Sequence, residues 1–439
     1  MKTATKTKFK QTEIGKSPEL GTAGEWRQAR LAEICVHSAF GPRFSGELYA
    51  PDGNVATLRT TDISEDGRIE YATMPLARLD LSKFQQHLLH EDDLVVTRTG
   101  RVGTTAVFDG FRLPVLAGAF LIRFRLNREL AEPHFYRYYF NSPEGCALIT
   151  SVATGSVQQN LNITSLHGLV IPVPPLREQR AIAHILGTLN DKIELNHQMN
   201  KTLEAIGQAI FKHWFIDFEF SNEEGKPYKS SGGEMTYNKE LEKEIPKSWL
   251  VKPIDKVADF LNGLAMQKYP AVNEIEFLPV IKIRELRQGI TDASGKASLD
   301  IPKKYVVRDG DVLFSWSGSL EVVIWTSGEG ALNQHLFKVT SKDYPKWFYY
   351  YWLLQHLAGY RHIAEGKATT MGHIQRHHLK SSLVVVPDRT GLQTMDKILS
   401  SLVERIIELN MESRNLSRIR DSLLPKLMSG KVRVPVEAR

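Results

Sequence analysis

The chain has 439 residues, of which 42% are hydrophobic and 24% charged, and its formal net charge is +6. This length exceeds what one compact core holds, so we expect two to three domains. The composition is that of an ordinary soluble protein, and the mild positive charge permits nucleic-acid binding without establishing it. The two cysteines, Cys35 and Cys146, exclude a disulfide framework and favour a reducing cytoplasm. No apolar run reaches the ~18 residues of a membrane span, and the basic N-terminus lacks the apolar core of a signal peptide, so we expect no membrane partner.

The first part of the chain alternates between short β-like runs and turns. Residues 1–25 are polar and rich in lysine, and we expect a flexible basic tail there. Order is expected from Trp26, and glycine and aspartate punctuate the following strands, as turns require. The expected strands and one aromatic helix are 55–58, 94–97, 104–108, 120–124 and 132–141.

A long helix is expected next, over residues 176–215. Pro174 and Pro175 suit its first turn, and apolar residues recur at heptad spacing in two narrow columns, which is typical of a coiled-coil seam. The columns contain Ile182, Leu189, Leu203 and Ile210, and Leu186, Ile193 and Trp214. About 40 residues make a rod of roughly 60 Å, too long for one domain to bury. The one polar member, Asn196, either fixes the register of a helix pair or is partly exposed at the seam.

A second stretch near the C-terminus supplies the partner. Its two columns contain Met395, Leu402, Leu409, Leu416 and Leu423, and Leu399, Ile406 and Leu427. Two such helices, separated by a whole domain, can pair parallel or antiparallel. In the antiparallel case the two globular domains would lie at opposite ends of the rod and be related by an approximate two-fold axis.

An internal repeat relates the two halves of the chain. The matching landmarks are Trp26 with Trp249, DLVVTRTG (93–100) with DVLFSWSG (311–318), EPHFYRYYF (132–140) with YPKWFYYYW (344–352), LVIPVPP (169–175) with LVVVPD (383–388), and IELN (193–196) with IELN (407–410). We therefore expect a globular domain (26–174), a central long helix (175–217), a linker (218–244), a second globular domain (245–389), a C-terminal long helix (390–430) and a tail (431–439). The fold class is α+β: two similar mixed α/β domains alternate with two long helices that pair as an antiparallel coiled coil. DNA has local two-fold symmetry, and dimeric proteins place two reading elements on it at a defined spacing.

With these features in place, the chain closely resembles the specificity subunit of type I restriction-modification systems. The resemblance covers nearly everything after about residue 24. It rests on PVPPLREQRAI (172–182), LNDKIELN (189–196), KHWFIDFEF (212–220), TTMGHIQRHHL (369–379) and IRDSLLPKLMSG (419–430). It implies two target recognition domains, each reading one half of a bipartite double-stranded DNA site, and helices that set the spacer length and dock two modification (methyltransferase) subunits. Restriction subunits would add a translocase and nuclease. S-adenosylmethionine, ATP and Mg would bind the partner subunits, with no cofactor on this chain and no catalysis by it.

Two alternatives remain: a stand-alone or fused DNA methyltransferase or nuclease, and a structural coiled-coil adaptor without DNA specificity. The enzyme alternative lacks its motifs. Gly15-Lys16-Ser17 is the nearest text to a nucleotide-binding loop, but Lys10 stands where its first glycine belongs. Asn- or Asp-Pro-Pro-aromatic, expected in a DNA amino-methyltransferase, is missing. His373 and His377 could share a helix face, but no glutamate accompanies them as in a zinc protease, and we expect no metal.

Candidate DNA contacts in the first half come from two polar segments. Arg98, Thr99 and Arg101 surround Gly100 in a donor-rich turn, and arginine pairs well with guanine edges and phosphates. The alternative is a solvated loop. The second segment contains Ser156, Gln158, Gln159 and Asn160, whose amides suit adenine edges. Here the alternative is that Ser156 or Asn160 caps a helix.

The corresponding candidates in the second half are Ser315, Ser317, Lys367, Thr369, Thr370, His373, Gln375 and Arg376. Trp316 stands where the first half has Arg98, so contacts transfer less directly between the halves. The aromatic helices around Phe135 and Trp347 could stack on bases, but their helical spacing favours core packing.

Overall fold

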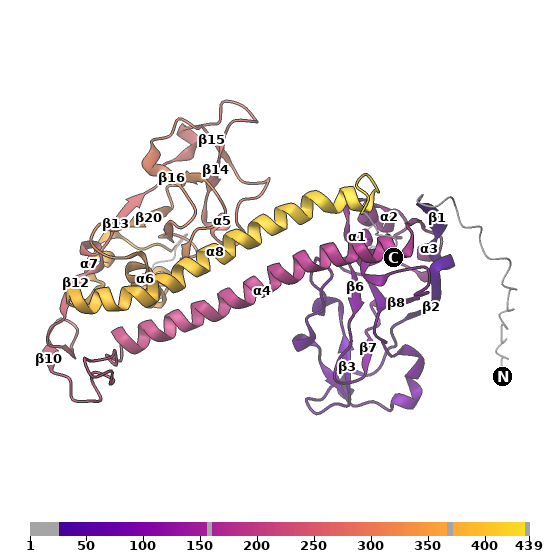
Figure 1. Cartoon of the computed structure of the whole chain (residues 1–439), viewed down its shortest axis with the longest axis horizontal. Helices are drawn as coiled ribbons and strands as arrows, with labels where there is room; N and C mark the ends of the chain where they lie inside the picture. Colours follow the sequence, from indigo (N-terminus) through magenta and orange to yellow (C-terminus); the bar gives the residue numbers. More distant parts are fainter. Residues whose placement is uncertain (1–25, 156–159, 367–371, 435–439) are drawn as a thin grey trace, which may run out of the picture. The chain divides into compact units, whose positions relative to one another are not determined.

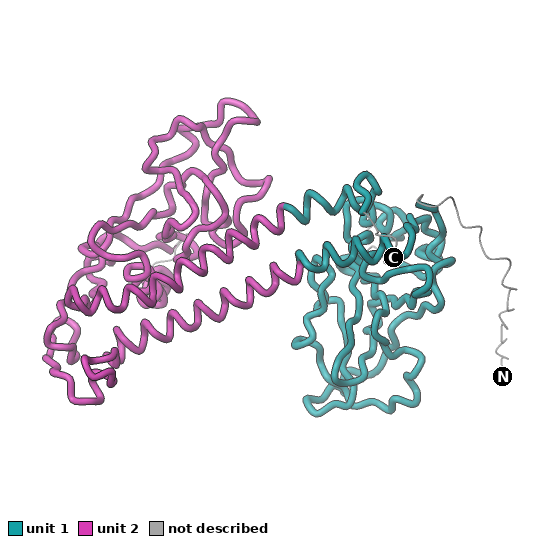
Figure 2. The backbone as a smooth tube through the Cα atoms, in the orientation of Figure 1, with its two compact units in different colours: residues 1–189, 419–439 teal, residues 190–418 magenta. Residues whose placement is uncertain are grey.

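The computed structural model describes residues 26–155, 160–366 and 372–434, which form two compact units (Figure 2). Unit 1 comprises 1–189 and 419–439, and unit 2 comprises 190–418. The expectations for the tail 1–25 and for Ser156, Gln158, Gln159, Lys367, Thr369 and Thr370 fall outside the described residues. None of the described helices combines the length and apolar character needed to cross a bilayer.

Unit 1 contains an antiparallel four-stranded sheet, a mixed three-stranded sheet and an antiparallel strand pair. The four-stranded sheet has the order β2-β8-β5-β6, the three-stranded sheet has the order β4-β3-β7, and β1 pairs with β9. The strands are β1 Arg27–Arg30, β2 Cys35–Phe40, β3 Val55–Leu58, β4 Leu76–Ala77, β5 Asp93–Thr97, β6 Thr105–Phe108, β7 Val115–Ala117, β8 Leu121–Leu126 and β9 Val170–Val173. The helices are α1 Pro133–Asn141, α2 Pro143–Ser151 and α3 Ile163–His167 (Figure 1). The strands expected at 55–58 and 94–97 and the aromatic helix therefore form within one residue of their expected ends.

Burial explains why these segments are regular. All residues of β3, β5 and β6 are buried, as expected of strands covered on both faces. The aromatic side chains of α1 belong to the main core of unit 1, where Phe135 and Tyr136 are completely buried. Core packing of this helix, rather than base stacking, is confirmed by that burial.

Unit 2 repeats this organisation. Its sheets have the orders β13-β20-β17-β18 and β15-β14-β19-β16, and β12 pairs with β21. The strands are β10 Met235–Asn238, β11 Lys243–Pro246, β12 Leu250–Pro253, β13 Asp259–Asn262, β14 Leu278–Ile281, β15 Lys296–Ala297, β16 Val306–Val307, β17 Val312–Ser315, β18 Val322–Ile324, β19 Gly330–Leu332, β20 Leu336–Thr340 and β21 Leu383–Val386. The helices are α5 Ile283–Gln288, α6 Lys346–Glu365 and α7 Arg376–Ser381. The internal repeat of the sequence is thus a repeat of sheet topology, to which unit 2 adds β16 and the β10-β11 pair.

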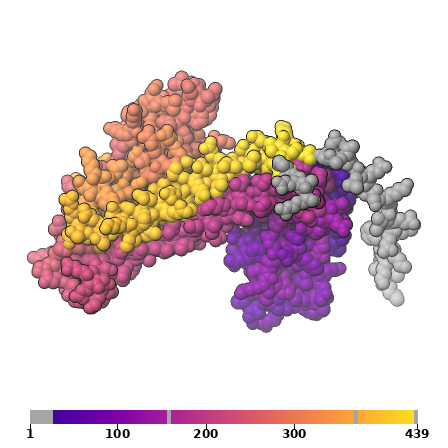
Figure 3. Space-filling view, in the orientation of Figure 1, coloured from indigo at the N-terminus to yellow at the C-terminus, as the bar shows by residue number. Residues whose placement is uncertain are grey.

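The two long helices are α4 (Leu176–Phe215) and α8 (Arg389–Met428), each of 40 residues. In Figure 3 the side chains of α8 (yellow) lie against those of α4 (magenta). Within unit 2, Asn196 Nδ2 donates to Glu412 Oε2 over 2.9 Å, and Asn200 Nδ2 donates to Asn410 Oδ1 over 2.7 Å. The residue numbers rise along α4 as they fall along α8, so these segments run in opposite directions. Asn196 is completely buried, and the alternative that it is partly exposed at the seam is wrong.

Within unit 1, the start of α4 meets the end of α8. Leu427 and Met428 join the core that contains Ile182 and Leu186. The PPLREQ motif gains a structural role here, because Gln179 is buried and its Oε1 accepts from Glu132 N over 2.8 Å.

Glu178 fastens three distant segments of unit 1. Its carboxylate accepts from Trp26 Nε1 over 3.1 Å and from Arg433 Nε over 2.6 Å. The N-terminal strand pair, the start of α4 and the chain after α8 therefore meet at one carboxylate, and the expected tail is anchored at least at Arg433.

The stretch expected as a linker, 218–244, is folded. It contains β10 and the first half of β11, which form an antiparallel hairpin. Phe218 is buried against Trp249, and Phe220 stacks on Trp249 at 4.8 Å between ring centroids. This polar, glycine-rich stretch therefore contains two aromatic residues, Phe218 and Phe220, that pack on Trp249 of the following segment.

Candidate nucleic-acid interface

The predicted residue Arg98 lies directly after β5, on an aromatic ring. Its guanidinium carbon is 4.5 Å from the centre of the Phe40 ring, and its Nε donates to Asn160 Oδ1 over 3.1 Å. Its backbone N–H donates to the Phe120 carbonyl over 2.9 Å. Two predicted residues 62 positions apart, Arg98 and Asn160, therefore meet at one place. Phe40 and Phe120 are 36% and 55% exposed, so this cluster presents cationic and aromatic groups to solvent.

Asn160 does not cap a helix. It forms an antiparallel bridge with Thr154, with backbone hydrogen bonds of 2.8 and 3.0 Å. The residue that caps α3 is Asn162, whose Oδ1 accepts from Ser165 N over 2.8 Å. The capping alternative for Asn160 is therefore wrong, and its amide remains directed to Arg98.

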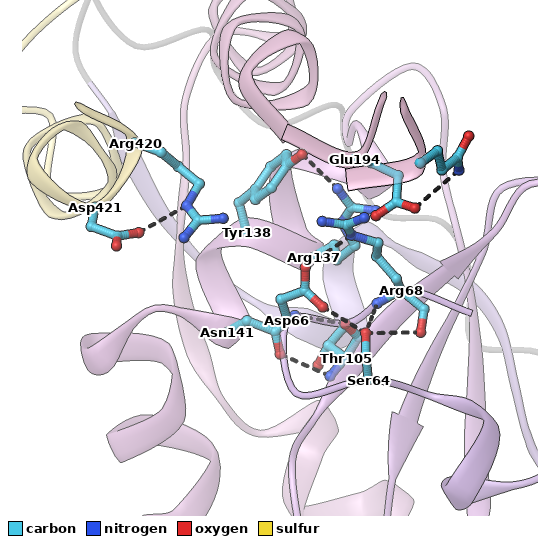
Figure 4. Close-up of polar contacts among 11 residues, drawn as sticks. Ser64, Asp66, Arg68, Thr105, Arg137, Tyr138, Asn141, Glu194, Arg420 and Asp421 are labelled. Carbon is cyan, nitrogen blue, oxygen red and sulfur yellow. Dashed lines mark hydrogen bonds and ion pairs between the residues drawn. The ribbon is translucent and has the colours of Figure 1, made fainter. Parts of the chain in front are cut away.

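Arg101 occupies a different environment from Arg98. Its Nη2 donates to the Ile63 carbonyl over 2.7 Å, and its Nη1 lies 3.4 Å from Glu65 Oε1. The turn after Ile63 is held by polar contacts among Ser64, Asp66 and Arg68 (Figure 4), including a 3.0 Å bond from Arg68 Nε to Asp66 Oδ2. The loop itself closes where the Thr97 hydroxyl donates to the Arg101 carbonyl. Arg101 and the half-buried Thr99 thus lie in a braced loop rather than an open one.

The strand that leads to this loop begins at a buried carboxylate. Asp93 accepts from Arg125 Nε over 2.8 Å and from the His90 backbone N–H over 2.8 Å. In unit 2, Asp311 repeats the arrangement with the Arg308 backbone N–H at 2.8 Å and Lys338 Nζ at 2.7 Å. The repeat therefore extends to the polar contacts that hold β5 and β17 in place.

In unit 2, Trp316 replaces the arginine. Its Nε1 donates to Asn262 Oδ1 over 2.9 Å, and its ring centre lies 6.4 Å from that of His373. Of the other predicted residues, Gln375 and Arg376 are exposed at the start of α7, and Arg376 lies 5.6 Å above the centre of the Phe337 ring. His373, Gln375 and Arg376 are therefore neighbours in one exposed segment that contacts Trp316.

Ser315 and Ser317 do not lie on this surface. Ser315 is completely buried, and its hydroxyl donates to the Ser319 carbonyl over 2.7 Å and accepts from Glu321 N over 2.7 Å. Ser317 is 4% exposed, with its hydroxyl 3.0 Å from His335 Nδ1. Both hydroxyls are used within the fold, which corrects the expectation that they face a ligand.

Comparison with known proteins identifies the family. The model of the type I restriction modification DNA specificity domain matches residues 24–205 and 246–416, one copy in each half. The chain belongs to this family.

Several similar proteins are named as type I restriction enzyme specificity subunits. The type I restriction enzyme MjaIX specificity subunit of Methanocaldococcus jannaschii is 25% identical over 98% of this chain and 97% of its own. The HindI specificity subunit of Haemophilus influenzae is 23% identical over 65% of this chain and 73% of its own. The crystal structure of an S subunit from M. genitalium, at 15% identity, superposes with a TM-score of 0.60 over 93% of this chain and 97% of that one, and so shares the fold. The chain is therefore the DNA specificity subunit of a type I restriction-modification system.

In this specificity subunit His378, next to His377, has a structural role. The Gln375 backbone N–H donates to His378 Nδ1 over 2.9 Å at the start of α7, so His378 serves as part of the helix cap. Among residues 26–155, 160–366 and 372–434, no group of three or more His, Cys, Asp or Glu side chains is placed to hold a metal ion.

Sequence reasoning missed Phe40 and Phe120, the exposed aromatic residues beside Arg98. Each stands next to a turn: Phe40 precedes Gly41-Pro42, and Phe120 follows Gly118-Ala119. An aromatic residue at the end of a strand and beside a glycine turn was the available signal. That sequence signal does not show that Phe40 and Phe120 contact Arg98.

Proposed function

We propose that this specificity subunit reads a bipartite, asymmetric sequence in double-stranded DNA, with domain 26–174 reading one half and domain 245–389 the other. The observation that carries the proposal is the repeat: two domains with matching sheets, the second of which has one more strand in unit 2, but with different residues at the matching places. Arg98 stands in one domain and Trp316 with Arg376 in the other. A shared scaffold with different polar surfaces suits two different half-sites. Direct readout requires such donors and acceptors at base edges.

We assign the DNA contacts residue by residue. In the first domain they are Arg98, Thr99, Arg101 and Asn160, together with Ser156, Gln158 and Gln159. In the second they are His373, Gln375 and Arg376, together with Lys367, Thr369 and Thr370. Ser315 and Ser317 are left out because their hydroxyls are buried and bonded.

We further propose that α4 and α8 pair as an antiparallel coiled coil, relate the halves by an approximate two-fold axis and set the spacer between the half-sites. The cross-helix bonds of Asn196 and Asn200 support this arrangement, since buried polar residues in a seam specify register. Both helices also carry exposed apolar side chains outside the seam. These are Leu195, Ile206, Ile398 and Ile419, between 42% and 50% exposed. They suit the docking of two modification subunits, which restriction subunits would then join.

A paired insertion tests whether the length of α4 and α8 sets the spacer between the half-sites. Seven residues are added to α4 after Asn200 and seven to α8 before Asn410, so that the seam keeps its register. Each insertion lengthens its helix by roughly 10 Å, equivalent to about three base pairs at ~3.4 Å each. We expect the methylated target to retain both half-sites and to gain up to about three spacer base pairs. Insertion into α4 alone is the control and should abolish methylation. If the lengthened helix pair leaves the spacer unchanged, or alters the half-sites, the proposal that the helices set the spacer is refuted.

A further inference from the structure

A pocket of about 520 Å³ opens in unit 1 between the Pro42–Tyr49 segment, the end of β3 and the turn before β8. We call it the Thr57 pocket. Its size lies within the ~300–1,000 Å³ of pockets that hold small organic ligands. The residues that line it include Arg43, Phe44, Tyr49, Thr57, Arg59 and Phe120. Aromatic, hydroxyl and cationic groups thus converge on one space.

Glycine allows the two walls to approach. The Gly41 N–H donates to the Leu121 carbonyl over 3.1 Å. A Cβ atom at Gly41 would collide with the carbonyl oxygen of Gly118. The segment that carries Phe44 is therefore fixed against the turn that carries Phe120, and the pocket is a built feature of the fold.

Thr57 provides a polar group without a partner. The residue is 2% exposed, and its Oγ1 makes no hydrogen bond with any atom of residues 26–155, 160–366 and 372–434. Its backbone N–H donates to the Pro75 carbonyl over 2.9 Å, so its place in β3 is secured without the hydroxyl. A buried hydroxyl that pairs with nothing is costly. A ligand with a donor or acceptor in the pocket would remove that cost.

The other walls indicate what kind of ligand fits. Phe120 and Tyr49 are 55% and 42% exposed, which offers ring faces to a flat aromatic group. Arg59 is committed to the buried Asp62 by bonds of 3.0 and 2.7 Å, and so forms a fixed wall. Arg43 is exposed and forms no ion pair within the part of the chain that the structure describes, which leaves its guanidinium available for a phosphate.

The pocket is continuous with the proposed DNA surface. Phe120, which lines it, accepts the backbone hydrogen bond of Arg98 and follows the turn at Gly118. Arg98 in turn lies on Phe40, two residues before Pro42 of the pocket wall. A nucleotide displaced from a duplex held at Arg98 would therefore meet Phe120 first.

We propose that the Thr57 pocket binds one unstacked nucleotide of the DNA target, with its base among the aromatic residues and the Thr57 hydroxyl and its phosphate at Arg43. This rests on the proposed DNA-reading function of the first domain. The chemistry fits a single nucleotide, and we assign its source to the bound duplex rather than to a free nucleotide.

The test measures whether removing one base of the target and altering one pocket residue have additive effects on DNA binding. The complete chain with its modification subunits, without methyl donor, is bound to duplexes that each lack one base of the target. Phe120→Ala and Thr57→Val are measured against wild type. Each variant should weaken binding of the intact target, by about tenfold for Phe120→Ala and about fivefold for Thr57→Val. At one nucleotide, removal of the base should make both variants equal to wild type, because the two losses share one interaction. Tyr237→Ala, an aromatic residue of unit 2 that is 61% exposed, is the matched control.

Three results would overturn the proposal. In the first, the losses are additive at every nucleotide. In the second, Thr57→Val lowers the thermal midpoint, whereas loss of an unpaired hydroxyl should leave it unchanged or raise it. In the third, deoxynucleoside monophosphates bind the chain in a Thr57-dependent way while the DNA losses stay additive, which assigns the pocket to free nucleotides. A wild-type complex without sequence preference would instead refute the proposed function itself, so the two failures are distinguishable.

Discussion

Asn200 donates a 2.7 Å hydrogen bond from its Nδ2 to Asn410 Oδ1, across two helices that lie more than two hundred residues apart in the chain. Asn410 occupies the position in the second IELN motif that Asn196 occupies in the first, and Asn196 bonds across the same helices to Glu412. Both copies of the repeated asparagine are therefore used in the contact between α4 and α8. A polar seam of this kind favours one register over others.

The first prediction concerns this seam. Asn200 is 6% exposed, and its Oδ1 has no partner among the described residues. The double variant Asn200→Leu/Asn410→Leu removes both amides together, and we expect the free energy of unfolding to rise by about 1 kcal/mol. Register should loosen, so methylation should extend to targets whose spacer differs by one base pair. Urea unfolding measures the stability, and methylation of DNA targets with different spacer lengths measures the spacer preference. Gln198→Leu, at an exposed position of α4, is the control. A destabilised variant with an unchanged spacer preference would contradict the prediction.

The second prediction compares the repeated carboxylates. The Asp93 side chain is 1% exposed, bonded to Arg125 and 3.8 Å from the buried Arg123, whereas Asp311 is 22% exposed beside Lys338. Asp93→Asn leaves two arginines without their counter-charge and should cost about 3–5 kcal/mol. Asp311→Asn should cost less than Asp93→Asn, because both Asp311 and Lys338 stay partly in contact with water and only one cation loses its partner. Calorimetry of the two variants measures the difference, and equal costs would show that burial does not govern these pairs.

The third prediction is a pH dependence. His356 packs between Trp352 and Tyr360 with its Nε2 3.1 Å from the Leu383 carbonyl, and burial lowers its pKa below the ordinary value of 6.5. The unfolded chain therefore takes up a proton near pH 6.5 that the folded chain resists, so this contribution to stability is present above that pH and is lost as the pH falls. Urea midpoints between pH 5 and 8 should fall less steeply for His356→Gln than for wild type. His197→Gln, an exposed residue of α4, should leave the slope unchanged. Identical slopes for His356→Gln and wild type would show that His356 does not contribute to the pH dependence of stability.

The fourth prediction separates the two half-sites. Arg98→Ala should weaken DNA binding by about tenfold and affect only one half of the target, and Arg376→Ala should affect only the other half. Relaxed base preference at one position would indicate a base contact, whereas a uniform loss with a salt slope reduced by about 1 would indicate a phosphate contact. Arg112→Ala is the control, because Arg112 also lies on an aromatic ring, 5.8 Å from the centre of Phe111. An effect of Arg98→Ala on both halves would contradict the two-domain reading.

The periodic elements and their duplication can be recognised in the order of the amino acids alone. Heptad spacing predicted a helix over 176–215, and the structure has Leu176–Phe215. The matched motifs anticipated two domains, and both contain a four-stranded sheet of equivalent order, β2-β8-β5-β6 and β13-β20-β17-β18. These features could be predicted because a helix or strand buries one face at a fixed period, which remains visible in the order of residues.

The folded chain, in contrast, shows which polar groups meet. It joined Arg98 to Asn160 and Phe40, buried Ser315 within a turn, and folded the expected linker onto Trp249. It also left the Thr57 hydroxyl unpaired in a pocket whose walls come from three segments. Such contacts depend on where the backbone brings distant residues together and on which side chains become buried away from water. Neither property has a local period, so the sequence named several of the right residues but not their arrangement.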